Sequence, residues 1–233
     1  MKIIVGNWKM NGTKSAFENM TKIIAQTNTT NRIIVCPPYT LLGCDKNGIA
    51  TGAQDISTHD NGAYTGEISG QMIADTGAKY VIVGHSERRL YHNESDETVK
   101  QKATMAIQNK LIPIICVGET LDERESKKTE KVIKSMLDNC IPNTENDFII
   151  AYEPRWAIGT GITPTPNEIE TVHNIIFEHL KAHNHETRPI LYGGSVSPAN
   201  AETISAIPHV DGLLIGGASL KPDTFIPIIE SIK

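Results

Sequence analysis

Short apolar runs recur eight times along the chain, and polar segments with helical periodicity separate most of them. The runs are rich in Ile and Val and mostly do not alternate with polar residues, as is typical of strands buried on both faces. They are Ile3–Val5, Ile33–Cys36, Ile49–Ala53, Tyr80–Val83, Ile112–Val117, Phe148–Tyr152, Ile190–Tyr192 and Leu213–Ile215. The pattern predicts eight strands of a parallel sheet covered by helices.

The segments between the runs carry signals for helix starts. Ser95 precedes two acids and is typical of an N-cap, and Thr165-Pro166-Asn167-Glu168 resembles a capping box with proline at the first helical position. Ser197-Pro198 and Lys221-Pro222-Asp223 are expected to open two further helices. Strands and helices therefore alternate through the chain.

Eight strand–helix units in 233 residues, without a long insertion, predict an α/β fold of the closed (β/α)8 barrel type. An open, doubly wound sheet is the competing architecture. No Pro/Gly/Ser-rich linker or shift in composition divides the chain, so residues 1–233 are expected to form one domain. In a closed barrel, the reacting side chains lie on the loops that follow the strands.

Composition narrows the classes of partner and compartment. The net charge is −5 and no Lys/Arg-rich run is present, which argues against nucleic acid or an anionic membrane as a partner. No stretch approaches the roughly 20 apolar residues of a membrane span, and the first apolar run is too short for a signal peptide. The four cysteines lack C-x-x-C spacing, and Cys36 and Cys116 lie within apolar runs, as reduced core thiols do. A cytoplasmic location is expected.

One carboxylate follows the sixth run. Glu153 precedes Pro154, which ends a strand because it has no N–H, and an apolar loop bounded by glycines follows. This arrangement suits a base covered by a lid. Taken alone, a Glu-Pro pair is more typical of a solvated acid, so the interpretation depends on the other strand ends.

Polar candidates also follow the first and fourth runs. His85 precedes a short predicted helix, whose N-terminus disfavours imidazolium and favours a neutral ring that donates a hydrogen bond. Asn7 and Lys9 follow the first run, and Lys9 would bring a positive charge to the mouth of the barrel. Glu87 is one candidate partner for Lys9, although the next two residues, both arginine, compete for it.

Glycine pairs follow the seventh and eighth runs. Gly193-Gly194 precedes Ser195, and Gly216-Gly217 follows the last strand. Backbone N–H groups at such glycines approach an anion closely, and a phosphate site after strands seven and eight recurs in this architecture. Gly159-Thr160-Gly161 matches no nucleotide-binding fingerprint.

Together, these residue types indicate one kind of reaction. A carboxylate base, a histidine, a lysine and an anion site suit proton abstraction beside the carbonyl of a small phosphorylated compound. No metal site is predicted, because His179, His183 and His185 are interpreted as a solvated helix end far from these loops. Asp122-Glu123-Arg124-Glu125 is interpreted as an exposed helix face.

Seven segments, in order along the chain, resemble the triosephosphate isomerase family. They are Gly6–Asn11, Gly62–Glu67, Gly84–Arg89, Cys116–Glu119, Ala151–Pro154 with its loop, Tyr192–Val196 and Gly216–Leu220. The match covers essentially the whole chain. It implies interconversion of dihydroxyacetone phosphate and D-glyceraldehyde 3-phosphate, a step of glycolysis and gluconeogenesis, without a cofactor or metal.

The resemblance also implies residue roles. Glu153 would move a proton through an enediolate, neutral His85 would polarise the carbonyl, and Lys9 would supply fixed charge, with Asn7 positioning; the same enzyme is the standard worked case for this pairing. The phosphate-binding residues would be Gly159, Ser195, Gly216 and Gly217, alongside Asn7 and Lys9. The supporting residues would be Glu87, Cys116 and Thr65.

A lid and a homodimer are implied as well. Pro154–Thr163 would close over the substrate. The polar loop Gln54–Gly66 would enter a neighbouring subunit and place its Thr65 near the active site of that subunit, beside the residues equivalent to Asn7 and His85. The chain departs from the family pattern at Arg155, where the lid hinge is usually small and apolar, and at Ile162-Thr163-Pro164.

Two alternatives remain open from the residues. One is another phosphate-binding barrel enzyme, such as a sugar-phosphate epimerase or an aldolase, although a Schiff-base aldolase needs a desolvated lysine. The other is a catalytically silent barrel that acts as a binding protein, which would usually have lost the base, the histidine or the lysine.

Overall fold

The computed structural model describes residues 1–158 and 163–233. Within this part of the chain, parallel strands pair in sequence order and the last returns to the first, which closes a barrel. The strands are β1 (Ile3–Asn7), β2 (Arg32–Cys36), β3 (Ala50–Ala53), β4 (Tyr80–Val83), β5 (Ile112–Val117), β6 (Ile149–Tyr152), β7 (Ile190–Tyr192) and β8 (Gly212–Ile215). The closed (β/α)8 barrel predicted from the sequence is confirmed, and the open sheet is excluded.

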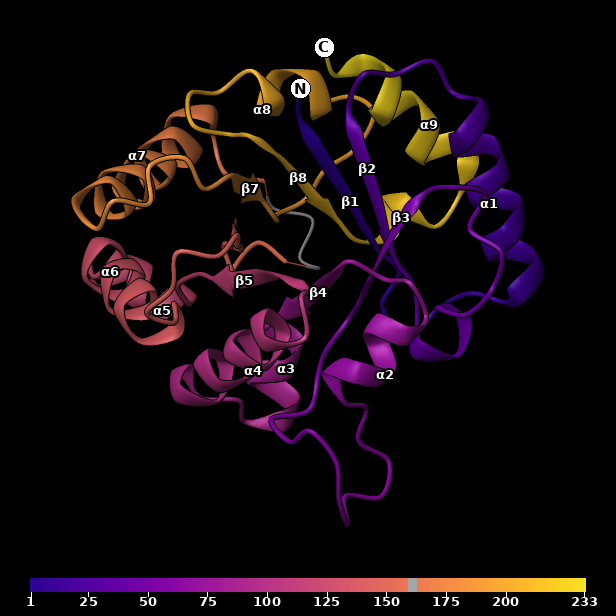
Figure 1. The fold of residues 1–233 in the computed structure, drawn as a ribbon. Helices are drawn as coiled ribbons and strands as arrows, with labels where there is room; N and C mark the ends of the chain where they lie inside the picture. Colours follow the sequence, from indigo (N-terminus) through magenta and orange to yellow (C-terminus); the bar gives the residue numbers. More distant parts are fainter. Residues whose placement is uncertain (159–162) are drawn as a thin grey trace.

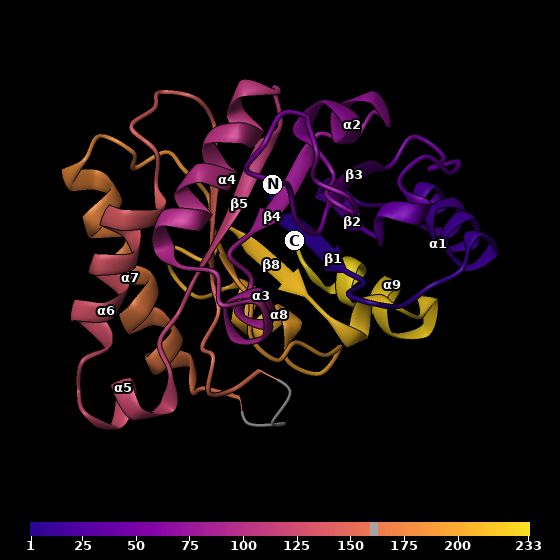
Figure 2. The same ribbon diagram turned by 90° about the horizontal axis from the view of Figure 1, so that it is seen from below.

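Helices surround the barrel (Figure 1). The α-helices are α1 (Lys14–Gln26), α2 (Gly70–Asp75), α3 (Ser86–His92), α4 (Asp96–Gln108), α5 (Leu121–Glu125), α6 (Thr129–Cys140), α7 (Pro166–Ala182), α8 (Ala201–Ser205) and α9 (Pro222–Ser231). Two short 3-10 helices follow β2 and β8, η1 (Tyr39–Leu41) and η2 (Gly217–Ser219). The two termini lie close together at the end of the barrel where the strands begin (Figures 1 and 2).

Two apolar layers explain why the strands do not alternate with polar residues. One cluster contains only strand side chains, such as Val5, Ile34 and Ile82, and fills the interior of the barrel. The other joins the outward strand residues, such as Ile4, to the apolar faces of the helices. Both faces of each strand are therefore buried, as the sequence pattern predicts.

Most predicted helix starts are confirmed. The Ser95 hydroxyl accepts from the N–H of Thr98, 3.1 Å away, and Thr165 forms the predicted capping box with Glu168 at the start of α7. The prediction at Ser197-Pro198 was wrong. The side chain of Asn200 accepts the N–H of Ser197 and closes a turn, so α8 begins only at Ala201.

The described residues also show the state of the cysteines and the hydropathy of the helices. All four cysteines are in the described part of the chain and none is in a disulfide. Among the described residues, no helix combines the length and hydropathy that crossing a bilayer requires.

The loop after β3 extends away from the barrel (Figure 1, lower edge). Its start, at Gln54 and Asp55, is half-buried beside the barrel mouth, whereas residues 59–67 are all exposed. No regular element is present between β3 and α2. A projecting loop of this length without its own secondary structure is uncommon in a compact domain.

Candidate functional site

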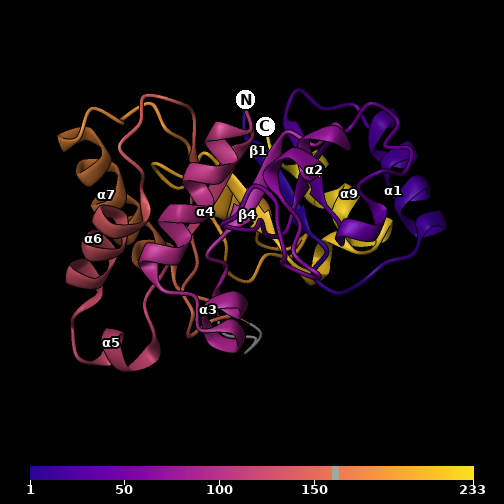
Figure 3. The same ribbon diagram turned by 60° about the horizontal axis from the view of Figure 1, so that its bottom comes forward.

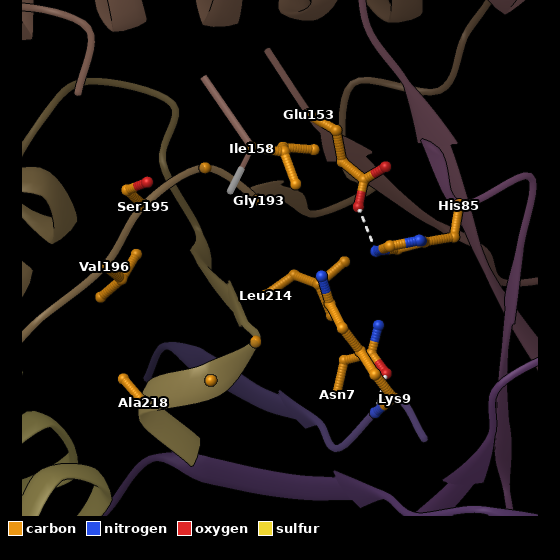
Figure 4. A pocket seen from close by; sticks show the side chains of 13 residues that line it. Asn7, Lys9, His85, Glu153, Ile158, Gly193, Ser195, Val196, Leu214 and Ala218 are labelled. Carbon is orange, nitrogen blue, oxygen red and sulfur yellow. Dashed lines mark hydrogen bonds and ion pairs between the residues drawn. The ribbon is translucent and has the colours of Figure 1, made fainter. Parts of the chain in front are cut away.

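A pocket of about 260 Å³ lies among the loops that follow the strands. Figure 4 shows Asn7, Lys9, His85 and Glu153 on one side of it, facing Ser195, Val196 and Ala218 across the cavity. Its lining includes the predicted residues Asn7, Lys9, His85, Glu153, Ser195, Gly216 and Gly217. Gly159 lies outside the described residues. The fold thus brings together side chains and glycines from the ends of five strands, β1, β4, β6, β7 and β8.

Glu153 lies directly after β6 and is 2% exposed. Its Oε2 accepts the backbone N–H of Ser86 at 2.8 Å, and its Oε1 is 3.1 Å from Nε2 of His85. The carboxylate is therefore buried, and each of its two oxygens accepts one hydrogen bond. Desolvation and fixed orientation are what a strong base in a closed site requires.

His85 forms the N-cap of α3. Its Nδ1 accepts the backbone N–H of Glu87 at 3.2 Å, so this nitrogen carries no proton. The proton is then on Nε2, which donates to Glu153. The ring is neutral in this arrangement and presents one N–H to the pocket.

Lys9 follows β1 in the left-handed backbone region, with φ of 51°. Its N–H donates to Oδ1 of Asn7 at 3.0 Å, and its carbonyl accepts from the Gln54 amide at 2.9 Å. Its ammonium group lies 2.6 Å from Oε1 of Glu87. These contacts hold a conformation that costs about 1–3 kcal/mol for a residue other than glycine, which is typical of a functional position.

The two arginines after Glu87 do not compete for it. Arg88 pairs with Asp55 at 2.9 Å, and Arg89 pairs with Asp96 at 2.6 Å. The ambiguity left by the sequence is therefore resolved in favour of Lys9 as the partner of Glu87.

The opposite wall is formed by the loops after β7 and β8. Gly216 and the short helix η2, which begins at Gly217, contribute backbone to the pocket. A side chain at Gly216 would lie 3.3 Å from Cε of Lys9, so the glycine keeps this wall close to the cation. The Ser195 hydroxyl donates to the carbonyl of Ala157 at 3.3 Å. Backbone amides near a lysine form a suitable place for an anion.

Cys116, predicted as a supporting residue, lies on β5 near Glu153. It is 1% exposed and is paired in register with Ala151, two residues before Glu153. Burial raises the pKa of its thiol well above the usual value, and the nearby Glu153 raises it further. Cys116 therefore remains a neutral packing residue rather than a nucleophile.

A buried network beside the pocket was not anticipated from the sequence. Glu119 is fully buried; the Tyr152 hydroxyl is 3.2 Å from both of its carboxylate oxygens, and Nε1 of Trp156 donates to Oε1 at 3.0 Å. The backbone N–H of Arg155 donates to the carbonyl of Glu119 at 3.1 Å. In the sequence, Glu119 is an acid two residues after the fifth apolar run and ends the segment Cys116–Glu119, but nothing there indicates its partners.

Arg124 belongs to the same network, which corrects its interpretation as part of an exposed helix face. Its guanidinium lies 4.3 Å from the centre of the Trp156 ring and pairs with Glu168. It also lies 3.6 Å from Glu119. The network joins α5 and α7 to the loop that follows Glu153.

Gly118, directly after β5, packs against the backbone of Glu153. A methyl group there would overlap the carbonyl oxygen of Glu153. We expect Gly118→Ala to displace Glu153, lowering the free energy of unfolding by about 1–3 kcal/mol and reducing kcat. Urea unfolding and steady-state kinetics measure the two effects. Gly43→Ala is the control, because a Cβ there meets nothing within 4 Å; equal behaviour of the two variants would contradict the packing argument.

Comparison with known proteins places this geometry in a family. The profile described as "Triosephosphate isomerase" matches residues 2–232. The triosephosphate isomerase of Alkalilimnicola ehrlichii is 43% identical over 245 residues, covering 99% of this chain and 98% of that protein. The Halorhodospira halophila enzyme is 45% identical over 242 residues, covering 99% and 97%.

A solved structure agrees with these sequence matches. The crystal structure of triosephosphate isomerase from Bartonella henselae superimposes with a TM-score of 0.89 at 37% sequence identity. The superposition covers 99% of this chain and 98% of that one.

Proposed function

The chain belongs to the triosephosphate isomerase family, and on this premise we propose how its own residues carry out the reaction. It is an isomerase that interconverts dihydroxyacetone phosphate and D-glyceraldehyde 3-phosphate. The observation that carries the assignment of roles is the buried pair of Glu153 and His85, 3.1 Å apart, in the same pocket as Lys9.

Glu153 is the proposed base. It would remove a proton from the carbon next to the substrate carbonyl and return it to the neighbouring carbon. The Glu153 carboxylate accepts bonds from Ser86 N–H and His85 Nε2. A substrate carbonyl that takes the His85 proton as its hydrogen-bond partner would release one of these two bonds and free the carboxylate to react.

His85 and Lys9 would stabilise the enediolate. Nε2–H of His85 is the neutral donor, and the ammonium of Lys9 supplies the fixed charge. Such preorganised groups act strongly because they need no reorientation as negative charge develops on the oxygen. Asn7 would hold the Lys9 backbone through its 3.0 Å bond.

The phosphate would lie against the opposite wall. Ser195 and the backbone of Gly216 and Gly217 are supported as its ligands by their position in the pocket, and Lys9 approaches the same wall. Gly159 remains a prediction from the family resemblance.

Pro154–Thr163 is the proposed lid, of which residues 159–162 are outside the described part of the chain. Its start is anchored by the bonds from Arg155 and Trp156 to Glu119. Closure would exclude water and protect the enediolate from losing phosphate. Arg155 at the hinge is expected to affect the rate of closure rather than the chemistry.

The second proposal is a homodimer joined through the Gln54–Gly66 loop. A pocket of about 250 Å³ lies beside the first and shares Asn7, Lys9 and His85 with it. Met10 and Tyr91 line it while remaining 95% and 71% exposed. A loop tip from a second copy would cover these apolar side chains and bring its Thr65 next to the reacting residues.

Thr65→Arg is therefore expected to weaken the dimer at least about tenfold and to lower kcat with it. The added cation would approach Lys9 and Arg88, and like charges at an interface are strongly unfavourable. Sedimentation equilibrium and steady-state kinetics provide the measurements. Thr30→Arg, at another exposed threonine, is the control. A fully active, dimeric Thr65→Arg protein would contradict the proposed interface.

Two coarser assignments are part of the same proposal. We propose that residues 1–233 fold as one domain, supported by the closure of β8 on β1. We also propose a cytoplasmic location, supported by the family's place in glycolysis and by the four unbridged thiols.

A coupled assay with D-glyceraldehyde 3-phosphate in chelator-treated buffer tests the proposed cofactor-free mechanism. Turnover that persists after metals are removed is the expected result, because every proposed group belongs to the protein. The residue pattern gives little support to an aldolase, because Lys9 is paired with Glu87 rather than desolvated. Turnover that is lost in chelator-treated buffer and restored by added metal would contradict the cofactor-free mechanism, and no turnover in either buffer would favour a binding protein instead.

A further inference from the structure

Two histidines and an aspartate gather on the outer surface of the barrel. His179 lies in the last turn of α7, His183 is its C-cap, and Asp138 lies near the end of the neighbouring helix α6. Figures 1 and 3 show α6 and α7 side by side. These helix ends lie at the face of the barrel opposite the carboxyl ends of the strands. The cluster is therefore separate from the catalytic pocket.

The three side chains are already close to coordination distance. One ligand atom from each residue lies within 4.8 Å of the others. Nε2 of His179 and Oδ1 of Asp138 are only 3.1 Å apart. The His179 and His183 rings are 4.5 Å apart between centroids, as expected from positions four residues apart on a helix.

Hydrogen bonding prepares His183 as a ligand. Its Nδ1 is 2.8 Å from the carbonyl oxygen of His179, so it must donate there. The remaining nitrogen, Nε2, then carries the free lone pair. Metal-bound histidines usually have such a carbonyl or carboxylate partner on the other nitrogen, because it fixes the tautomer and the ring orientation.

A lysine on α6, Lys134, also lies near the cluster. Lys134 is itself paired with Glu130 at 2.7 Å, which offsets its repulsion of a cation.

We propose that Asp138, His179 and His183 form a Zn²⁺ site that joins α6 to α7. Two imidazoles and one carboxylate suit zinc and related transition metals, whereas magnesium and calcium prefer oxygen ligands. Ligand atoms around tetrahedral zinc lie about 3.3 Å apart. The Asp138–His179 separation is close to this value, and all three ligand atoms lie within 4.8 Å of one another, so small shifts of the exposed Asp138 and His183 side chains complete the site.

Asp138 is the residue that changes the interpretation of these histidines. The sequence places His179 and His183 at a helix end, where solvated side chains are common. It does not show that a carboxylate from α6, some forty residues earlier, lies against them. A ligand from each of two helices makes the site a cross-link, and binding to the folded form alone would stabilise the protein.

Calorimetric titration with zinc chloride, in chelator-treated buffer, tests the proposal. The wild-type protein is expected to bind one Zn²⁺ per chain, and His183→Gln and Asp138→Asn are each expected to bind at least tenfold more weakly. Glu230→Gln is the control, since it removes an exposed acid from α9, away from the cluster. It should bind as the wild type does.

Two results would overturn the site. One is the absence of saturable zinc binding by the wild type; the other is unchanged affinity in either ligand variant. A second measurement requires no variant: zinc at a hundredfold excess over its Kd should raise the wild-type Tm by about 5 °C, and magnesium should not. Equal Tm values in the two salts would count against the cross-link. Neither outcome bears on turnover of the triose substrate.

Discussion

Glu153→Gln is expected to lower kcat by about three orders of magnitude while the protein still folds and binds phosphate. The amide has nearly the same shape as the carboxylate and still accepts the Ser86 N–H, but it cannot accept a proton from the substrate. General bases contribute about 10²–10⁴ to rate, and the expected loss lies in the middle of this range. Steady-state kinetics with either triose phosphate measures the effect.

Two comparisons separate lost chemistry from lost structure. Glu230→Gln, at an exposed acid on α9, should leave kcat unchanged. Inorganic phosphate should inhibit Glu153→Gln with a constant close to that of the wild type, because Glu153 is not among the proposed phosphate ligands. Near-normal turnover by Glu153→Gln would refute its role as the base.

Lys9→Met is expected to lower kcat/KM by about three orders of magnitude, with a contribution from a higher KM. Methionine retains the length of the side chain but removes the charge that faces both the enediolate and the phosphate. Loss of one preorganised electrostatic group costs about 10²–10³ in rate, and weaker substrate binding adds to it. Glu87 also loses its 2.6 Å partner and would bring an unbalanced negative charge to the pocket.

Lys14→Met provides the control for Lys9→Met. Lys14 is largely exposed and lies 3.8 Å from Glu18, so its loss should change neither kcat nor KM. A fall in kcat/KM of less than about fivefold in Lys9→Met would show that its charge is not used in the transition state.

The barrel was predictable because its signal is repeated and local. Each strand carries its own apolar run, and each of the runs lies within a residue or two of an observed strand. Caps such as Thr165 act within four residues and are equally visible in the sequence. The prediction at Ser197 failed because two local signals compete there. A proline after a serine also fits a turn, and the side chain of Asn200 accepts the N–H of Ser197 and favours that turn.

The sequence predicts only those residues of the candidate site that follow a strand. Asn7, Lys9, His85 and Glu153 each follow a strand, so closure of the barrel brings them together. Contacts between distant segments were not accessible. The fully buried Glu119 and its bond from Trp156 depend on the path of the chain after Glu153.

Arg124 and Asp138 illustrate the same limit on helix surfaces. Sequence periodicity assigns both to polar faces, but it does not show what the adjacent helix presents to them. Arg124 turns toward Trp156 and Glu168, and Asp138 turns toward His179.

The central claim is that Glu153 transfers a proton between the two carbons, and isomerisation in D2O tests it most directly. Dihydroxyacetone phosphate formed from unlabelled D-glyceraldehyde 3-phosphate is analysed by NMR at C1 before the reaction reaches equilibrium. The account predicts deuterium at C1, because a proton held on a carboxylic acid exchanges with solvent before it is returned. Deuterium incorporation by Glu153→Gln at the wild-type rate would contradict it, since another group would then carry the proton.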